Sequence, residues 1–330
     1  MYKPEEITSL TLLAGFLRCR VDQIEMLKSK YDSVLEMRIP KHNRRYGYRV
    51  VYSSKNHLLS NTLKCLQFEL NKLYVPMKCV GGFVHGRGVS YNAMPHINKR
   101  VVLTLDIKDF FESIPFEKVV TTLVKYGFAT EMANHIAEIV TLNNVLVTGF
   151  NTSPVIANMC CEEMDSELLD LCRSKGLSYT RYADDLTFSG GNIDCIEAIK
   201  TIINRYGFLI NEKKTRLYRK GGPQYVTGLT VSDDKYPRIP NRIKRQLRAE
   251  IYYIVRWGLL SHALYNLRES GKSREEICVK VAVRVVGWLN YINSVEPMYA
   301  KKYKEYLFTH VNREDIGFFE SAERYIKERF

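Results

Sequence analysis

Several features are scarce or missing in this sequence, and each absence narrows the class of protein. The eight cysteines include no Cys-x-x-Cys pair and lie mostly in apolar, helix-like stretches, so we expect reduced core residues rather than zinc ligands or disulfides. No stretch approaches the roughly 20 apolar residues of a membrane-spanning helix, and no basic segment leads into an apolar one at the N-terminus. These absences predict a soluble, cytoplasmic protein with no membrane partner.

Internal repeats and low-complexity linkers are also absent, so boundaries must be placed by charge and periodicity. A chain of 330 residues is long enough for two or three subdomains, because single domains commonly hold about 100–150 residues. The 49 Lys and Arg exceed the 36 Asp and Glu, for a net charge of +13. This excess, together with 22 Tyr and 14 Phe that could stack on bases, favours a nucleic-acid partner over a generic solvated surface.

The N-terminal third contains a basic segment followed by a leucine stripe. Residues 38–49 carry five cations and no acid and lead into the β-branched and aromatic residues 50–52, which predicts a basic hairpin. After Ser53 and Ser54 the leucines recur at steps of three and four residues, which predicts an amphipathic helix capped by serine. The leucines are Leu59, Leu63, Leu66, Leu70 and Leu73.

From about residue 236 the pattern becomes helical and basic. One apolar stripe is followed by a second apolar run near Val279–Ile292; the stripe consists of Ile243, Leu247, Ile251 and Ile254. Residues 236–330 hold 18 Lys and Arg against 11 Asp and Glu, a net charge of +7. We interpret this part as a helical subdomain that grips a nucleic-acid duplex through phosphates, with a solvated helical face as the alternative.

The most informative segment is Tyr182-Ala183-Asp184-Asp185. Residues that favour strands precede and follow it, and Ala-Asp-Asp suits a tight turn, which predicts a β-hairpin with two acids at its tip. Adjacent carboxylates repel each other unless a cation lies between them. A solvated Asx-type turn is the alternative for an isolated pair of this kind.

A third acid, Asp106, ends the apolar stretch 100–106, which reads as a central buried strand. Strand pairing could bring Asp106 to Asp184 and Asp185 although the three are far apart in sequence. Phosphoryl transfer from a nucleoside triphosphate uses two metals about 3.5–4 Å apart, which three carboxylates can bridge. Further along the chain, Ser153 and Pro154 read as the N-cap and first residue of a helix beneath the hairpin.

With these residues in view, the chain resembles reverse transcriptases of the bacterial retron type from about residue 38 to residue 235. The resemblance rests on three ordered segments: Leu105–Phe111 (LDIKDFF), Tyr182–Asp185 (YADD) and Gly207–Thr215 (GFLINEKKT). It implies an α+β right-hand polymerase fold with an antiparallel-sheet palm. Residues 1–100 would form N-terminal helices and fingers, residues 101–235 the palm with finger helices near 115–145, and residues 236–330 the helical thumb.

The resemblance also implies a metal site and a general acid. Asp106 and Asp184 would bind two Mg²⁺ ions, for which Mn²⁺ is a possible substitute, with Asp185 assisting and the Ile107 carbonyl adding a ligand. Lys214 would protonate the departing pyrophosphate, with a charged helix cap as the alternative explanation of that lysine.

Five residues are implied to contact the incoming deoxynucleoside triphosphate. Arg49 would grip the triphosphate with Arg45 or Lys41 nearby, and its planar fork suits phosphate oxygens. Phe111 would be the steric gate against a ribose 2′-hydroxyl. Thr148 stands where the family has Gln beside the sugar, and Gly149 follows it as the family pattern requires.

Two short elements resemble those that accompany retron enzymes. They are Asn92-Ala-Met-Pro-His96 and Val226-Thr227-Gly228. Asn and His can read RNA edges or 2′-hydroxyls, so we hypothesise that both elements help hold a structured RNA. A satisfied structural histidine is the alternative for His96.

The implied function is synthesis of single-stranded DNA on a dedicated structured noncoding RNA, primed from an internal guanosine 2′-hydroxyl, to give an RNA–DNA hybrid (msDNA). Retrons of this kind act in antiphage defence with a separate effector protein. The chain ends soon after the expected thumb, so no ribonuclease H domain or fused nuclease is expected. The alternatives are a group II intron-like or abortive-infection reverse transcriptase, or a polymerase-derived RNA-binding scaffold.

Overall fold

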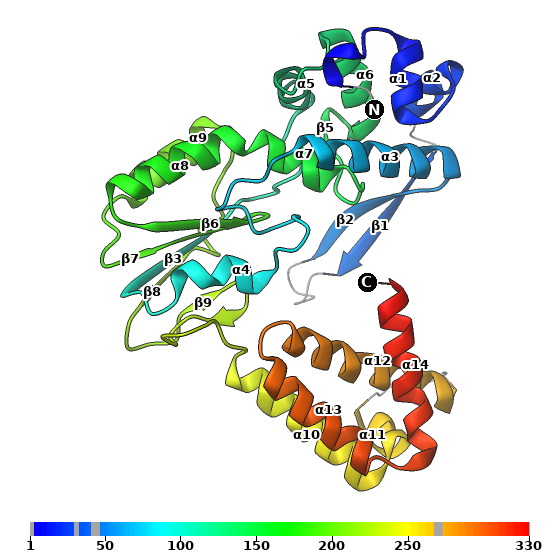
Figure 1. Cartoon of the computed structure of the whole chain (residues 1–330), viewed down its shortest axis with the longest axis vertical. Helices are drawn as coiled ribbons and strands as arrows, with labels where there is room; N and C mark the ends of the chain where they lie inside the picture. Colours follow the sequence, from blue (N-terminus) through cyan, green and yellow to red (C-terminus); the bar gives the residue numbers. More distant parts are fainter. Residues whose placement is uncertain (1–2, 30–32, 41–46, 267–272, 330) are drawn as a thin grey trace. The chain divides into compact units, whose positions relative to one another are not determined.

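The computed structural model describes residues 3–29, 33–40, 47–266 and 273–329 (Figure 1). The chain divides into two compact units, Met1–Gly222 and Pro223–Phe330. The second unit begins before residue 236 because a short hairpin precedes its helices.

The first unit contains a four-stranded antiparallel sheet (Figure 1). Its order is β6-β7-β3-β8, and the strands are β6 (Ser178–Tyr182), β7 (Asp185–Gly190), β3 (Val101–Asp106) and β8 (Arg216–Arg219). β3 is an interior strand, because β7 and β8 pair with its two edges, and its apolar side chains are buried. The prediction of a central buried strand that ends in Asp106 is confirmed.

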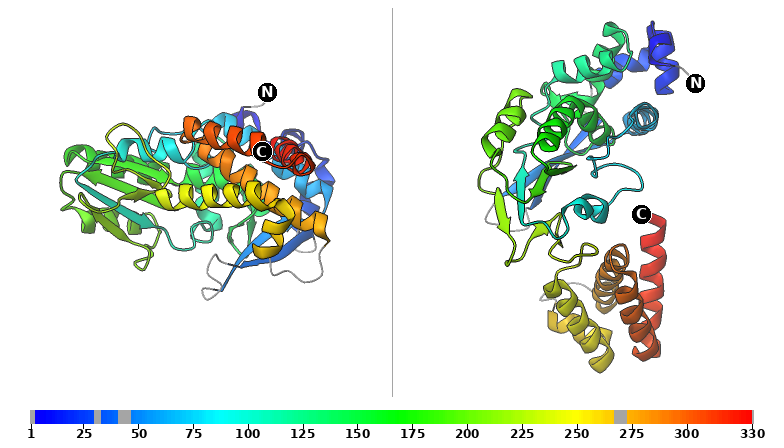
Figure 2. Two further views of the ribbon diagram at one scale, coloured as in Figure 1. Left: turned by 90° about the horizontal axis from the view of Figure 1, so that it is seen from below. Right: turned by 60° about the vertical axis from the view of Figure 1, so that its left-hand side comes forward.

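Different elements cover the two faces of this sheet (Figures 1 and 2). They are α8 (Glu162–Ser174) and α9 (Ile196–Arg205) on one face, and α4 (Val89–Ala93) with the 3₁₀-helix η4 (Met94–His96) on the other. Successive side chains of a strand point to opposite faces. Accordingly Arg181 of β6 bonds to Asp165 of α8, whereas its neighbour Thr180 bonds to His96 of η4.

The predicted basic hairpin and leucine helix are both present. β1 (Val34–Pro40) pairs with β2 (Tyr48–Ser54), and α3 (His57–Leu73) follows. The predicted serine cap is wrong. Ser53 and Ser54 still belong to β2, and Asn56 caps α3 by accepting a hydrogen bond from the Leu59 N–H at 2.8 Å.

The remaining helices of the first unit are η1 (Pro4–Glu6), α1 (Leu10–Leu17), α2 (Val21–Lys28), α5 (Phe116–Lys125), α6 (Thr130–Val140) and α7 (Ser153–Cys160), with the short strands β4 (Thr141–Leu142) and β5 (Val145–Leu146). Among these helices, α1 and α7 pack on α3, α2 packs on α6, and α5 packs on α6 and α7. Ser153 is the first residue of α7 and Thr152 its N-cap, so the predicted cap is displaced by one residue.

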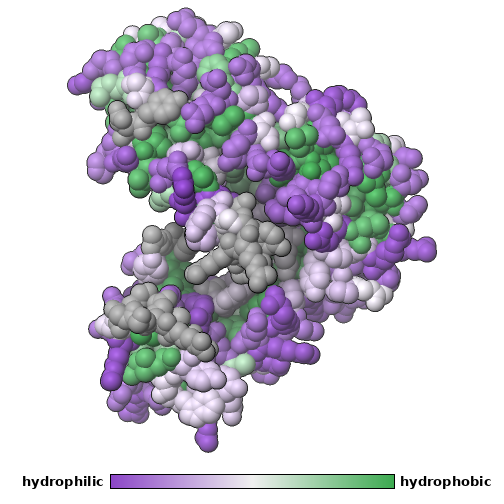
Figure 3. Space-filling model, turned by 180° about the vertical axis from the view of Figure 1, so that it is seen from behind, coloured by the Kyte–Doolittle hydropathy of each residue, from purple (hydrophilic) through white to green (hydrophobic). Residues whose placement is uncertain are grey.

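The second unit is helical, as predicted. The hairpin β9 (Tyr225–Val226) and β10 (Leu229–Thr230) precedes α10 (Asn241–Trp257), α11 (Leu259–Asn266), α12 (Arg274–Asn293), α13 (Pro297–His310) and α14 (Arg313–Arg329). Hydrophilic and hydrophobic residues are interspersed over the face in Figure 3. No described helix is both long and apolar enough to cross a membrane. All eight cysteines are free, and six of them are buried, as expected of core residues.

Candidate active site

Strand register places two of the predicted acids opposite each other. The β3–β7 ladder runs without interruption from the pair Val101↔Gly190 to the pair Asp106↔Asp185. Directly opposed residues of an antiparallel pair have Cβ atoms about 4.5–5.5 Å apart on one face of the sheet. The Asp106 and Asp185 side chains therefore leave the same face at the same end of the sheet.

The third acid lies in the turn between β6 and β7. Tyr182 pairs with Asp185, so Ala183 and Asp184 are the two turn residues. Ala183 has a φ of +58° and Asp184 is not among the positive-φ residues, which is the pattern of a II′ hairpin turn. The Ile107 N–H donates to the Asp184 carbonyl at 2.9 Å and fixes this turn beside the end of β3. The predicted hairpin is confirmed.

A glycine that we did not predict supports the turn from outside. A Cβ atom on Gly82 would lie 2.3 Å from the Ala183 nitrogen, so only glycine allows this approach. The preceding residues extend the sheet, since Gly81 N–H donates to the Arg181 carbonyl and Arg181 N–H to the Cys79 carbonyl, both at 2.8 Å. The signal in the sequence was the run at 81–88, which contains four glycines.

A buried polar network supports the β6–β7 hairpin on the face of the sheet that α8 covers. The fully buried Arg181 donates to both carboxylate oxygens of the fully buried Asp165, at 2.6 Å from Nη2 to Oδ2. Tyr179 also donates to Asp165, and Arg181 donates to the Asn158 side-chain oxygen. The Asn158 amide in turn donates to the Gly82 carbonyl at 3.0 Å. This network joins α7, α8, β6 and the Gly82 segment around the turn.

The lysine-bearing segment is fastened to the end of β3 by backbone hydrogen bonds. The Asn211 N–H donates to the Asp106 carbonyl and the Lys108 N–H to the Leu209 carbonyl, both at 2.8 Å. This places Lys214 Nζ 2.7 Å from Asp106 Oδ2, with 57% of the lysine side chain exposed. Lys214 thus lies within the acid cluster.

The electrostatics of the site follow from these positions. Desolvation raises the pKa of Asp185 to about 7, and repulsion from Asp184 and Asp106 adds to this effect. Asp185 still touches solvent, because it lies at the end of the sheet. Desolvation also raises the pKa of Asp184, again with repulsion from Asp106, while Lys214 and Arg49 oppose that rise. The site therefore concentrates negative charge that Lys214 and Arg49 offset only in part.

The three acids suit divalent cations in their chemistry. Within the described part of the chain, no three His, Cys, Asp or Glu side chains stand in a metal-holding arrangement, and Asp106 is paired with Lys214 instead. Hard cations such as Mg²⁺ prefer carboxylate and carbonyl oxygens, which are the donors present here. A cation would also relieve the repulsion that raises the pKa of Asp185.

Aromatic rings border the site beyond Asp106. The half-buried Phe111 ring lies 5.4 Å from that of Phe110 and 6.0 Å from that of Phe83, between ring centroids. Phe83 has a φ of +60° and follows Gly82, so the segment that supports the turn also presents this ring. Sequence reasoning missed Phe83.

The predicted nucleotide-binding residues 148 and 149 contact β2. Thr148 donates from its hydroxyl to Glu112 at 2.7 Å, and its carbonyl accepts from the Tyr52 N–H at 2.8 Å. Gly149 has a φ of +108°, and a Cβ there would lie 2.4 Å from the Tyr52 carbonyl oxygen. Arg49 is an exposed residue of β2, opposite Ile39. Arg45 and Lys41 lie outside the described residues.

The predicted RNA-contacting residues of the first element are interior. His96 is fully buried, and its ring nitrogens lie 2.6 Å from Ser189 Oγ and 2.8 Å from Thr180 Oγ1. Burial lowers the pKa of His96 to about 3, so the ring is neutral. Asn92 is also fully buried, and its side-chain amide has no hydrogen-bond partner among the described residues. In this conformation neither side chain has surface to offer RNA, because both are used to pack η4 and α4 on the sheet.

The second predicted element is a tight turn in the second unit. Val226 pairs with Leu229, and both turn residues, Thr227 and Gly228, have positive φ, at +45° and +82°. This is the I′ geometry that two-residue hairpins favour. Val226 is buried, whereas Gly228 is exposed at the tip.

Comparison with known proteins identifies relatives of this chain. It is 35% identical over 240 residues to the retron Mx65 reverse transcriptase of Myxococcus xanthus, covering 64% of this chain and 56% of that protein. It is 32% identical over 219 residues to the retron Ec86 reverse transcriptase of Escherichia coli, covering 65% and 62%. The chain thus spans less than two thirds of the length of these two relatives. Among solved structures, a telomerase from Candida albicans matches with a TM-score of 0.47 and 11% identity, over 88% of this chain and 60% of that one.

A profile of the family described as reverse transcriptase (RNA-dependent DNA polymerase) matches residues 39–244. The matched range includes β3, β6 and β7 and the turn that carries Asp184. The predicted α+β polymerase fold with an antiparallel palm sheet is confirmed. Because the match extends over more than half of its residues, the chain belongs to the reverse transcriptase (RNA-dependent DNA polymerase) family, and its relatives include retron-type members.

Proposed function

We propose that this protein is a retron reverse transcriptase that copies part of a dedicated structured noncoding RNA into single-stranded DNA. The observation that carries the proposal is the register that sets Asp106 opposite Asp185 with Asp184 in the adjoining turn. A scaffold protein would have no use for clustered carboxylates, which repel nucleic acid. The substrates would be deoxynucleoside triphosphates.

Asp106 and Asp184, with Asp185 assisting and the Ile107 carbonyl as a further ligand, would hold two Mg²⁺ ions, or Mn²⁺ as a substitute. Such a metal pair activates the attacking hydroxyl and stabilises the triphosphate and its leaving group. Lys214 would exchange its ion pair with Asp106 for a position from which Nζ gives a proton to the departing pyrophosphate. The Lys214 side chain is largely exposed, although that of Asp106 is buried, and this exposure supports the exchange because Nζ can move through solvent.

Phe111 would exclude a ribose 2′-hydroxyl, with Phe83 packed beside it. Arg49 would bind the triphosphate, and its influence on the pKa of Asp184 supports a location near that acid. Gly149 would border the sugar, and Thr148, tied to Glu112, would take the place of the family Gln. Arg45 stays a predicted contact.

We assign residues 1–100, with helices near 115–145, to N-terminal helices and fingers, residues 101–235 to the palm and residues 236–330 to the thumb. The similarity to retron reverse transcriptases supports the retron type. On the family resemblance we further propose priming from an internal guanosine 2′-hydroxyl, to give msDNA, and a role in antiphage defence with a separate effector. The Thr227-Gly228 turn, whose Gly228 is exposed and whose Thr227 is half-buried, would contact the RNA directly. Asn92 and His96 would act on RNA indirectly, by fixing α4 and η4.

The decisive experiment is to purify the protein from its host and treat the bound nucleic acid with ribonuclease, deoxyribonuclease and debranching enzyme. We expect an RNA joined to a short DNA through a 2′–5′ link. The Asp184→Asn, Asp185→Asn double variant should contain no such DNA, whereas Asp194→Asn, a change of an exposed acid outside the site, should retain it.

RNA alone, identical in the wild type and the double variant, would refute the proposal and indicate a scaffold. DNA without a branch would indicate a reverse transcriptase of another bacterial type.

A further inference from the structure

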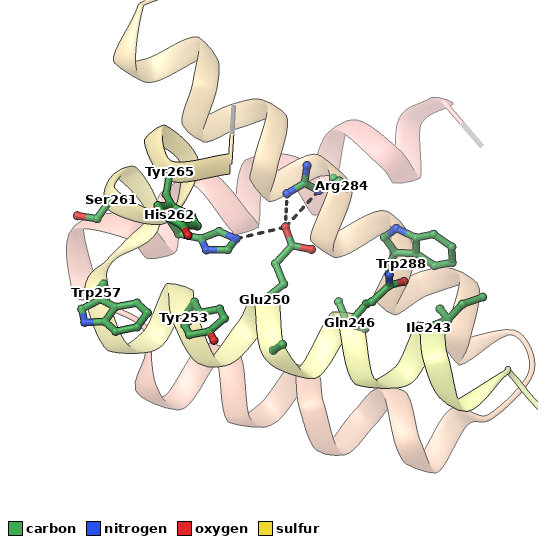
Figure 4. A pocket seen from close by; sticks show the side chains of 12 residues that line it. Ile243, Gln246, Glu250, Tyr253, Trp257, Ser261, His262, Tyr265, Arg284 and Trp288 are labelled. Carbon is green, nitrogen blue, oxygen red and sulfur yellow. Dashed lines mark hydrogen bonds and ion pairs between the residues drawn. The ribbon is translucent and has the colours of Figure 1, made fainter. Parts of the chain in front are cut away.

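A pocket of about 880 Å³ lies within the second unit, lined by residues of α10, α11 and α12 (Figure 4). Four lining residues, Gln246, Glu250, Tyr253 and Trp257, follow each other on α10 at steps of four, three and four. Residues at these steps lie on one face of a helix. Trp288 of α12 lines the pocket beyond Gln246 (Figure 4).

Aromatic rings form one wall of this pocket and are stacked in parallel. The Tyr253 and Trp257 rings lie 5.0 Å apart between centroids at an interplanar angle of 11°, and the His262 ring lies 6.2 Å from Tyr253 at 19°. Trp257 is 59% exposed. Exposed flat rings at a cavity are the surfaces on which nucleobases stack.

A carboxylate stands at the centre of the pocket. Glu250 Oε1 accepts hydrogen bonds from Arg284 Nε, at 3.1 Å, and from Arg284 Nη2, and it lies 3.5 Å from His262 Nε2 (Figure 4). Burial opposes the charge, but hydrogen bonds from His262 and Arg284 outweigh it and lower the pKa of Glu250. Glu250 is therefore ionised at neutral pH, and a carboxylate in that state only accepts hydrogen bonds.

We propose that this pocket binds an unpaired guanine base of a single-stranded nucleic acid. Guanine is the base whose Watson–Crick edge offers two adjacent donors, N1–H and the 2-amino group, to a carboxylate. Adenine and cytosine place an acceptor beside their single amino donor, and uracil flanks its N3–H with two carbonyls. The net charge of +7 over residues 236–330 favours the phosphates next to such a base.

The site deepens the proposed function by adding a base-specific contact within the predicted thumb, but it needs no polymerase chemistry. The Asp184→Asn, Asp185→Asn variant should therefore bind guanine as the wild type does. Loss of DNA synthesis with intact guanine binding, or the reverse, would separate the two proposals.

The chain contains two tryptophans, Trp257 and Trp288, and both line the pocket. Tryptophan fluorescence of the full-length protein therefore reports on this site. The probes are eight-nucleotide oligouridylates with a central guanosine, inosine, adenosine or uridine, and the deoxyribose form of the guanosine probe. We expect the guanosine probe to reach half-maximal quenching at a concentration about 10-fold lower than the inosine, adenosine and uridine probes, as a hydrogen bond to a charged carboxylate allows.

The deoxyribose arm distinguishes the sources of the base. Equal midpoints for the two sugars would assign the site to guanine of RNA or of DNA alike, and a lower midpoint for the ribose form would assign it to RNA. Inosine lacks the 2-amino group, so the guanosine–inosine comparison tests the carboxylate contact without any substitution in the protein.

Three variants complete the test. Glu250→Gln should abolish the preference for guanosine. Trp257→Leu should raise the concentration at half-maximal quenching about 10-fold for every probe, because a stacking surface is lost. Tyr306→Leu, which changes a partly exposed ring stacked on His310 in α13, should behave as the wild type does. Equal midpoints for all bases in the wild type would overturn the proposal, and so would the absence of quenching by every probe.

Discussion

At Asp185 the fold disfavours the ionised carboxylate that the proposed metal site requires. Strand register sets this residue beside Asp106 and Asp184, and its pKa is raised to about 7 by desolvation and then by repulsion from these two acids. A carboxyl whose pKa is raised in the folded state stabilises the fold below its unfolded-state pKa and loses that contribution as pH rises through the folded-state value. Here the window runs from an ordinary value of 3.8 to about 7.

In the metal-free protein, ionisation of Asp185 should therefore lower the free energy of unfolding as pH rises from 5 to 8. We expect Asp185→Asn to remove about 1 kcal/mol of that loss, a value reduced because the side chain reaches solvent. Urea unfolding at both pH values, with chelator, measures the effect. Addition of Mg²⁺ should stabilise the wild type at pH 8 more than at pH 5, and an identical response at both pH values would contradict the account.

The pKa shift of His96 changes stability with pH in the opposite direction to that of Asp185. Burial lowers the pKa of His96 to about 3 in the folded protein. As pH falls below 6.5, the ring therefore becomes protonated in the unfolded chain but stays neutral in the folded protein. Stability should fall as pH decreases below 6.5, by about 2 kcal/mol between pH 6.5 and pH 5. His96→Gln should show a smaller fall in urea unfolding over the same range, because the other titrating groups are common to both proteins. Equal falls would place the ring in contact with solvent.

Among the elements, β2 depends on a glycine far from it in sequence. Gly149→Ala would put a Cβ 2.4 Å from the Tyr52 carbonyl at a φ of +108°, so the hairpin or the 148–149 turn must shift. We expect a loss of about 2–4 kcal/mol in unfolding free energy, as for strained or overpacked sites. The affinity of the Gly149→Ala variant for nucleotide should also fall, if Arg49 on the same strand binds the triphosphate.

Gly287→Ala is the matched control, since a Cβ there has no atom within 4 Å and the residue lies inside α12. It should stabilise the protein by about 0.5–1 kcal/mol, because alanine is the better helix former. A comparable loss in both variants would mean that the contact with β2 is not the cause.

The hairpin β6–β7 is held by two features that lie outside it, the Gly82 contact and the pair Arg181–Asp165. A buried ion pair is retained only when its hydrogen bonds are well satisfied, and here the pair accepts or donates to Tyr179 and Asn158 as well. These contacts explain why a turn with Ala183 at positive φ persists.

For the whole molecule, the net charge of +13 predicts nucleic-acid binding that depends on salt concentration. We expect RNA affinity to fall at least about 100-fold between 50 and 200 mM salt, because each neutralised phosphate releases counterions. Arg242→Gln combined with Arg245→Gln on α10 should reduce the slope of log affinity against log salt by about 1–2. A flat response in a filter-binding titration would show that phosphate contacts do not dominate.

Local sequence was sufficient for the elements whose patterns are short-range. The strand before Asp106, the hairpin around Asp184 and the leucine stripe of α3 follow from strand propensity, turn chemistry and helical periodicity. The cap of α3 was misplaced because β2 runs two residues further, and that extension is decided by pairing with Val34 and Leu35.

The sequence by itself determined which groups are available: three acids, a lysine-bearing segment, a basic surface and a helical C-terminal part. Only the tertiary structure decided how they are used. It paired Lys214 with Asp106, buried His96 between Thr180 and Ser189, and brought Gly82 against the turn. The physical reason is that each of these outcomes depends on distances between segments remote in sequence, which packing and sheet register set and local propensity does not encode.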